Sequence, residues 1–551
     1  MPSIQSLALA GVVFLALLAA PLTAQNPQTP ASKPPAKSDT TASAGKPAFP
    51  SIDDSETAGT VNGMAYRAIA GTITVASDDG HDAQLGMDGQ WLAEAGVKFE
   101  KPEDAPATTR MFYAAYFRRD TRAAERPVVF LYNGGPGSSS MWLHMGSFGP
   151  KRVAITDGQH DLGAPYRVVD NASTLLDVAD LVFIDAPGAG FSRIFGKNKE
   201  KAFWGTDGDA HAFDRFIRRF LTKYDRWNSP KYLFGESYGT TRSAVLSATL
   251  QNVDLNGIIL LSQILSFDNS PDGPRFNPGV DLPYVLSLPT YAATAFYHHR
   301  IPSDAQPSAL EPFLGEAEHW AMTDYARALM QGNDLTEPER NAIAQKLNFY
   351  TGVPIAMILR SNLRLSGGYF EKNVQDASGL TTGRLDTRFA GPDMSRTSEE
   401  AEYDPQASAI SSAYTTAINQ YLRETLRFGR DMIYKPSIYA DTSFQWDLRH
   451  QQPFGPPASQ TTSVNVMNDL ATTMKGNPHM KVFLAGGYYD LATPYFAATY
   501  EMKHLAIPSS LAGNISYHWY QAGHMVYVNP DVLAKFHDDV AAFIRATEFA
   551  K

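Results

Sequence analysis

The stretch KYLFGESYGTTR, Lys231 to Arg242, joins a short apolar run to a helix-like run through the sequence GESYG. A Gly-X-Ser-X-Gly pattern between a strand and a helix is typical of a nucleophile elbow, in which the two glycines allow a sharp turn. The serine hydroxyl is then exposed at the carboxyl end of a sheet strand, whereas an ordinary strand-to-helix turn would give it no role. The stretch therefore predicts an α/β fold with Ser237 as its nucleophile.

The partners that a nucleophilic serine needs follow it in the chain, first an acid and then a histidine. Asp490 comes directly after the apolar run KVFLAGGYY, and His524 lies in QAGHMVY, just before the last helix-like run. A histidine there can take the serine proton while the acid holds its other ring nitrogen. Asp185 is an alternative acid but precedes the serine, and His518 is expected to pack on the preceding strand. We therefore predict a triad of Ser237, Asp490 and His524.

A second glycine-rich loop, NGGPG at Asn133 to Gly137, follows the apolar run RPVVFLY. The tetrahedral intermediate of acyl transfer needs backbone N–H groups directed at its oxyanion. In an elbow fold one donor is the residue after the nucleophile, here Tyr238, and the other comes from a loop after an early strand. The position of NGGPG predicts that it supplies this second donor; a plain glycine turn is the alternative.

Short apolar runs alternate with amphipathic runs in two parts of the chain, before residue 266 and after residue 430. This alternation predicts an α/β fold with a central, mostly parallel sheet covered by helices on both faces. Residues 266–430 interrupt it with long runs of helical period. We expect a catalytic domain formed by residues 50–265 and 431–551, with a helical cap insertion over residues 266–430.

The chain has 551 residues, a net charge of −10 and no cysteine. An acidic chain has no general affinity for nucleic acid or anionic lipid, so neither is an expected partner. The lack of cysteine excludes disulfides, thiolate metal sites and a cysteine nucleophile, and it fits a bacterial envelope protein better than a small disulfide-rich secreted one. We expect no metal and no organic cofactor.

The N-terminus carries an apolar run, Leu7 to Leu18, that has the length of a signal-peptide core and is short for a membrane span. We therefore expect a signal peptide over residues 1–24, with a retained membrane anchor as the alternative. Residues 25–49 are rich in Pro, Ala and Ser, which predicts an extended linker. Together these segments predict a periplasmic or secreted protein with no stable membrane association after removal of the signal.

Four motifs in a fixed order, NGGPGSSS, FIDAPGAGFS, GESYGT and AGHMV, resemble the serine carboxypeptidase family of α/β-hydrolases, whose members release C-terminal residues from peptides. The resemblance lies on both sides of the expected cap. It implies the α/β-hydrolase fold and a catalytic role for the predicted triad. It also implies that the oxyanion donors are the backbone N–H groups of Gly135 and Tyr238.

The resemblance further implies that Asn133 and Glu236 bind the terminal carboxylate of the substrate. The Asn133 amide can donate a hydrogen bond, but Glu236 can donate only when it is protonated, so recognition would weaken as Glu236 ionises. Activity should then favour acidic pH. The sequence departs from the family pattern in four places, and two of them concern this network, because Leu131 stands where Trp is usual and Ser147 where a second Glu is usual. Both changes weaken the expected carboxylate-binding network.

The expected function is an exported serine carboxypeptidase that cleaves peptides through an acyl-enzyme on Ser237. An esterase or acyltransferase with the same triad is one alternative, and a catalytically silent envelope binding protein on the same fold is another. The complete set of triad residues argues against the silent protein, because the loss of one residue would be enough to silence it.

Overall fold

The computed structural model describes residues 53–548, apart from 122–124, 161, 251, 273, 275–276, 303–305 and 456–462. The predicted signal peptide and linker, residues 1–24 and 25–49, lie outside the described residues and stay predictions. Within the described part of the chain, no helix is both long and apolar enough to cross a membrane.

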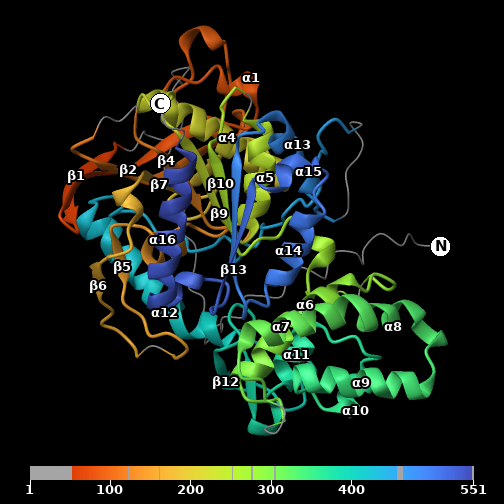
Figure 1. Ribbon diagram of the computed structural model, residues 1–551. Coiled ribbons are helices and arrows are strands. Elements are labelled where there is room, and N and C mark those ends of the chain that lie inside the picture. The colour runs from red at the N-terminus through yellow and green to blue at the C-terminus, as the bar shows by residue number, and fades with distance from the viewer. Residues whose placement is uncertain are drawn as a thin grey trace, which may run out of the picture.

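One large sheet forms the centre of the molecule (Figure 1). Its strands are β1 (Ser55–Val61), β2 (Met64–Ala76), β3 (Thr108–Arg118), β4 (Val128–Tyr132), β7 (Asp180–Ile184), β8 (Arg193–Phe195), β9 (Lys231–Glu236), β10 (Gly257–Leu261), β13 (Lys481–Gly487) and β14 (Ile515–Tyr520). They lie in the order β1-β2-β3-β7-β4-β9-β10-β13-β14, with β8 paired to β3. From β7 to β14 the neighbouring strands run parallel, whereas β1, β2, β3 and β7 pair antiparallel. Two small hairpins lie apart, formed by β5 (Lys151–Val153) with β6 (Val168–Asp170) and β11 (Leu380–Thr382) with β12 (Ala390–Pro392).

The parallel part of the sheet is covered on both faces, and its sequences reflect this. Every side chain of VVFLY in β4, DLVFI in β7 and GIILL in β10 is buried. Parallel strands between two helical layers need such continuous apolar runs, because neither face meets water. In β1, at the antiparallel edge, half-buried and exposed residues alternate instead.

Helices cover the two faces of the sheet. On one face lie α4 (Thr206–Lys223), α5 (Tyr238–Thr249), α13 (Met467–Gly476) and α14 (Tyr495–Lys503). On the other face lie α2 (Met141–Gly146), α12 (Pro405–Gln420) and α16 (Pro530–Thr547). The shorter helices α1 (Asp79–Asp82) and α15 (Ser509–Ala512) lie at the periphery in Figure 1, and α3 (Lys199–Phe203) directly precedes α4 in the chain. The result is the three-layer arrangement expected for parallel strands joined by helices.

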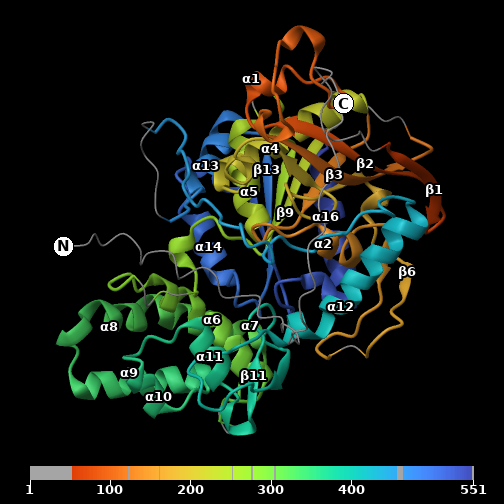
Figure 2. The same ribbon diagram turned by 180° about the vertical axis from the view of Figure 1, so that it is seen from behind.

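A separate group of helices lies beyond the carboxyl ends of the parallel strands (Figures 1 and 2). It contains α6 (Leu282–Tyr297), α7 (Leu310–Trp320), α8 (Ala326–Gln331), α9 (Glu337–Thr351), α10 (Ile355–Arg360) and α11 (Gly367–Asn373). These helices share a hydrophobic core of their own, which also takes in Tyr489, Leu491 and Tyr495 from the end of β13 and the start of α14. The helical group therefore rests on the turn that follows β13.

The last long helix of the expected cap, α12, lies elsewhere. Its buried residues, among them Ile410 and Tyr414, belong to the hydrophobic core between the sheet and α16. Figure 2 shows α12 beside β6 and away from α8, α9 and α10. An apolar helical face has the same period whichever body it covers, so periodicity could not assign α12 to one or the other. The expected cap limits of 266–430 remain a prediction.

The sheet order and the helical layers confirm the predicted fold class, an α/β-hydrolase fold with a central, mostly parallel sheet. The first consequence for function is geometric. Parallel strands end on the same edge of a sheet, so the loops after β4, β9, β10 and β13 gather there, and ligands of open α/β sheets bind at that edge.

Candidate active site

Ser237 lies at the sharp turn between β9 and α5. Its backbone has φ 60° and ψ −130°, a conformation that is rare for a residue with a side chain. The two flanking glycines are required, since a Cβ on Gly235 would lie 2.1 Å from the Gly239 carbonyl oxygen and one on Gly239 would lie 2.9 Å from the Tyr132 carbonyl oxygen. The predicted elbow is therefore present as a strained strand-to-helix turn that turns the serine outward.

Asp490 and His524 are directly hydrogen bonded. The His524 Nδ1 atom lies 2.8 Å from Asp490 Oδ2, and both side chains are buried. Thr493 fixes the carboxylate further, because its backbone N–H donates to Oδ1 at 3.0 Å and its hydroxyl to Oδ2 at 2.7 Å. Burial lowers the pKa of His524, but the charge of Asp490 and the hydrogen bond outweigh burial and hold the pKa above its usual value.

The end of β10 links this pair to the elbow. The Ser237 N–H donates to the Leu261 carbonyl at 3.0 Å, and the hydroxyl of the next residue, Ser262, donates to the His524 carbonyl at 2.6 Å. Among the described residues no hydrogen bond joins the Ser237 hydroxyl to the His524 ring. The structure thus joins the acid and the histidine directly and connects the serine to them through the backbone of β10.

The NGGPG loop lies on the first turn of α5. A Cβ on Gly134 would be 2.4 Å from the Tyr238 nitrogen and 2.5 Å from the Gly239 nitrogen, so only glycine allows this approach. Gly135 has φ +109°, which also favours glycine. Tyr238 is the first residue of α5, so its N–H has no partner within the helix. The predicted donors Gly135 and Tyr238 therefore belong to two backbone segments in close contact beside Ser237.

Asn133 and Glu236 form a buried hydrogen-bonded pair next to the serine. Asn133 Nδ2 donates to Glu236 Oε2 at 2.9 Å, and Asn133 Oδ1 accepts from the Leu143 N–H at 3.0 Å, which sets the orientation of the amide. Glu236 is 2% exposed, and burial raises the pKa of its carboxyl group to about 7. At acidic pH the group is thus protonated and can donate a hydrogen bond.

Sequence reasoning missed Tyr527, which completes this pair. Its hydroxyl lies 2.9 Å from Glu236 Oε2 and 3.1 Å from Oε1. Leu131 and Ser147, the two departures that concern this network, take no part in it, because Leu131 is buried in the sheet core and the Ser147 hydroxyl donates to the Leu143 carbonyl at 2.6 Å. A tyrosine three positions after the predicted histidine was the only available signal, and a buried tyrosine is usually part of a core.

A segment between the cap helices and α12, Arg384 to Arg388, was also missed. Its Leu385 carbonyl accepts the His524 N–H at 2.6 Å, and its Arg384 carbonyl accepts the Leu491 N–H at 3.1 Å. The segment therefore fixes the backbone on both sides of the acid–histidine pair. These contacts span more than a hundred residues of chain, and the loop that makes them carries no motif.

Asp386, at the centre of this segment, is fully buried. Its Oδ2 accepts the Gly523 N–H at 3.2 Å and lies 2.6 Å from Arg388 Nη2. Arg388 makes a second, bidentate ion pair with Asp157, with both distances 2.9 Å, and Asp157 in turn accepts from Asn529 at the start of α16. The histidine loop is thus held by a network that joins the cap side to the sheet side of the molecule.

The alternative residues have structural roles. Asp185 is buried, accepts the Ser140 N–H at 2.8 Å, and has a pKa raised by burial to about 6. His518 stacks on Phe483 with ring centres 4.0 Å apart, as expected for a packing residue. In the described part of the chain, no group of His, Asp and Glu side chains is arranged to hold a metal ion.

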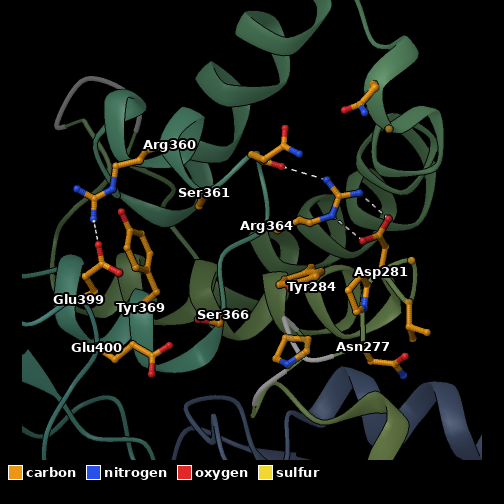
Figure 3. A pocket seen from close by; sticks show the side chains of 17 residues that line it. Asn277, Asp281, Tyr284, Arg360, Ser361, Arg364, Ser366, Tyr369, Glu399 and Glu400 are labelled. Carbon is orange, nitrogen blue, oxygen red and sulfur yellow. Dashed lines mark hydrogen bonds and ion pairs between the residues drawn. The ribbon is translucent and has the colours of Figure 1, made fainter. Parts of the chain in front are cut away.

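A cavity of about 720 Å³ lies within the cap (Figure 3). Its two arginines already have partners, because Arg364 pairs with Asp281 at 2.7 Å and Arg360 with Glu399 at 2.6 Å. None of the predicted catalytic or binding residues lines it. The cavity is therefore distinct from the site around Ser237.

Comparison with known proteins points to one family. Residues 102–258 match the family model described as Serine carboxypeptidase, Peptidase_S10. Serine carboxypeptidase-like 16 of Arabidopsis thaliana is 25% identical over 170 residues, which cover 29% of this chain and 38% of that protein. The pheromone-processing carboxypeptidase KEX1 of Arthroderma otae is 31% identical over 144 residues, which cover 24% of this chain and 20% of that protein. The chain thus matches less than half the length of these curated relatives.

Among solved structures, the prohormone-processing carboxypeptidase of Saccharomyces cerevisiae aligns with 87% of this chain and 91% of its own. The sequence identity is 15% and the TM-score 0.47. The matched family segment contains the NGGPG loop and the elbow, whereas Asp490 and His524 lie beyond it.

Proposed function

Residues 102–258 match the serine carboxypeptidase family model, and from that premise we propose that this protein is an exported serine carboxypeptidase acting on peptides. The single observation that carries the proposal is the buried Asn133–Glu236 pair, joined at 2.9 Å directly before the elbow serine. A hydrolase of neutral esters has no need for a carboxyl group that is kept protonated beside its nucleophile.

In the proposed reaction, the Ser237 hydroxyl oxygen attacks the carbonyl carbon of the last peptide bond while His524 Nε2 takes the hydroxyl proton. The negative oxygen that forms accepts hydrogen bonds from the N–H groups of Gly135 and Tyr238. His524 then gives the proton to the leaving amine, and an acyl-enzyme remains on Ser237. Water, activated by the same ring, releases the shortened peptide. Asp490 orients the ring and stabilises its charged form.

The terminal carboxylate of the substrate is bound by Asn133 and by protonated Glu236. The Asn133 amide can donate to the carboxylate, and neutral Glu236 donates through its O–H, whereas ionised Glu236 would repel the substrate. Burial raises the pKa of the Glu236 carboxyl group to about 7, so the group is protonated and peptide binding is strongest below neutral pH.

The N-terminal segments direct the protein out of the cytoplasm in this proposal. Residues 1–24 act as the export signal and residues 25–49 as a linker, so the mature protein is periplasmic or secreted. Within the expected cap, residues 266–430, the helices α6 to α11 lie beyond the carboxyl edge of the sheet and shape the pocket for substrate side chains.

The test uses purified protein with a panel of N-blocked dipeptides and the matching N-blocked amino acid ethyl esters. We expect release of the C-terminal amino acid, loss of all hydrolysis in Ser237→Ala, and a fluorophosphonate label on wild type but not on that variant. Asn133→Ala should lose most peptide hydrolysis and keep most ester hydrolysis. An equal loss on both substrates would favour the esterase alternative, and a folded wild type that no fluorophosphonate labels would exclude a serine hydrolase.

A further inference from the structure

The Glu236 carboxyl group has an unusual set of partners. In the described part of the chain its hydrogen bonds come from Asn133 Nδ2 at 2.9 Å and from the Tyr527 hydroxyl at 2.9 and 3.1 Å to its two oxygens. All three side chains are buried, with Tyr527 fully so. Among the described residues, the direct hydrogen-bond partners of the Glu236 carboxyl group are therefore two neutral side chains, and none of them is a second carboxyl group.

The residue that stands in place of the usual second glutamate cannot reach this group. The Ser147 hydroxyl donates to the Leu143 carbonyl at 2.6 Å, and its backbone N–H donates to the same oxygen at 3.0 Å. Ser147 therefore donates both of its hydrogen bonds to a carbonyl of α2, and its hydroxyl is not directed at Glu236. The hydroxyl group of Tyr527, from a distant part of the chain, contacts the Glu236 carboxyl group instead.

The surroundings of Tyr527 are shaped for its ring. A Cβ on Gly146, the last residue of α2, would lie 2.6 Å from the Tyr527 ring and 2.5 Å from the Tyr414 hydroxyl. Only glycine at this position leaves room for the aromatic ring to reach Glu236. The ring comes from the short helical turn Val526–Val528, which begins two residues after His524.

We propose that Tyr527 is the positioning residue that holds the Glu236 carboxyl group and controls its protonation, in place of a second acidic residue. The inference rests on the proposed function, because it deepens the role of the carboxylate-binding site. A tyrosine hydroxyl stays protonated across the physiological range and donates most strongly to the ionised carboxylate. Tyr527 therefore opposes the rise in the Glu236 pKa that burial causes. In this way it sets the pH at which the site stops binding carboxylates.

The charged groups that face Glu236 act in both directions. His524, on the loop before Tyr527, favours the ionised carboxylate, and Asp490, behind the histidine, disfavours it. Removal of the tyrosine hydroxyl changes neither of these charges. The shift expected in Tyr527→Phe can thus be assigned to the lost hydrogen bond, provided that the ring keeps its place.

The experiment follows the protonation of Glu236 by difference infrared spectroscopy, using the protonated-carboxyl band that disappears in Glu236→Gln. In Tyr527→Phe we expect the midpoint of this band to move upward by about one pH unit, as the loss of one hydrogen bond to a charged group implies. The pH at which KM for an N-blocked dipeptide begins to rise should move by the same amount. Tyr520→Phe is the matched control, because its hydroxyl binds a carboxylate, Asp539, at 2.8 Å and does not touch Glu236.

A second variant guards against a folding defect in Tyr527→Phe. Incorporation of 3-fluorotyrosine at position 527 keeps the ring and strengthens the donor, so the midpoint should move downward. An unmoved band in either folded variant would overturn the inference. The infrared titration does not require peptide hydrolysis, so a shifted band in a protein that cleaves no peptide would support the role of Tyr527 and reject the proposed function. An unshifted band in a protein that does cleave peptides would reject the role of Tyr527 and support the proposed function.

Discussion

The carbonyl oxygen of Leu385 accepts the backbone N–H of His524 at 2.6 Å, so a loop from the cap side holds the loop of the predicted catalytic histidine. The same segment binds the backbone after Asp490 through Arg384. The acid and the histidine thus share one external support, and substitutions in that support should reach the chemistry without touching a substrate.

Asp386→Asn tests this support. Removal of one charge from the buried Asp386–Arg388 pair should lower the free energy of unfolding by about 3 kcal/mol and loosen the Gly523 N–H contact beside His524. We expect a lower Tm and a lower kcat for each fluorophosphonate-titrated site. Asp393→Asn is the control, since it breaks another buried pair, with Lys372, and among the described residues Asp393 makes no hydrogen bond to the histidine loop. An equal fall of kcat in both variants would show that only global stability matters.

Asp490→Asn should leave the fold intact and lower kcat by about 10⁴-fold, because an amide cannot hold His524 in the required tautomer or stabilise its charged form. The measurement is kcat on both a peptide and an ester. Both should fall together, since the acid–histidine pair serves every acyl transfer. A loss below tenfold on either substrate would mean that Asp490 is not the acid of the triad.

Glu236→Gln should make KM for peptides independent of pH. In wild type the pKa raised by burial to about 7 keeps the carboxyl group neutral below that pH and ionised above it, so KM should rise from acidic to alkaline pH. Glutamine stays neutral throughout. Steady-state kinetics on an N-blocked dipeptide and its ethyl ester give the comparison, and a wild-type KM that is flat for the dipeptide would contradict the role of Glu236.

The same variant should also move the acid limb of ester hydrolysis. Burial lowers the pKa of His524, whereas the charge of Asp490 and its hydrogen bond raise it. The negative charge of Glu236 raises this pKa further, by a smaller amount. His524 must be neutral to take the serine proton, so kcat/KM falls when pH drops below this pKa. Glu236 carries this charge only above its pKa of about 7, so its removal should lower the pKa of His524 and shift the upper part of the limb, near neutral pH, to more acidic pH. A shift in the opposite direction would mean that the two groups do not interact as the geometry indicates.

Gly134→Ala should disrupt the oxyanion site. The added Cβ would lie 2.4 Å from the Tyr238 nitrogen, so the loop and α5 must move apart. Loss of one oxyanion donor typically costs about 10² to 10³ in kcat, on esters as well as peptides. Gly315→Ala, in α7, has open space around its Cβ and should be neutral or slightly stabilising. Retained kcat in folded Gly134→Ala would place the oxyanion elsewhere.

Local patterns predicted much of the fold. The segment Met64–Ala76, which is rich in β-branched and aromatic residues, forms β2, and the apolar residues of α4 from Phe213 to Leu221 lie on one helical face and are buried. The sequence TEPE at Thr336 has the spacing of a capping box and forms one with Glu339. Each of these signals lies within one element, where neighbours in the chain are neighbours in space. The chain order serine, acid, histidine likewise led to the Asp490–His524 pair, whose catalytic role stays a prediction.

The parts that could not be predicted depend on contacts between distant segments. Tyr527 meets Glu236 across 291 residues, and Asp386 meets Gly523 across 137. No periodicity or motif marks such a contact, since a buried tyrosine and a loop aspartate each occur for many reasons. The placement of α12 on the sheet has the same cause, because an apolar helical face does not specify its partner.

The support given by Arg384 to Arg388 has a consequence for exchanging caps between related enzymes. A graft that replaced the whole insertion would remove the hydrogen bonds to His524 and Leu491 together with the pocket. A graft that exchanged only α6 to α11 and kept this segment would change the proposed substrate pocket and keep the hydrogen bonds to His524 and Leu491. The practical boundary for redesign of specificity therefore lies between Asn373 and Arg384, inside the insertion and not at its end.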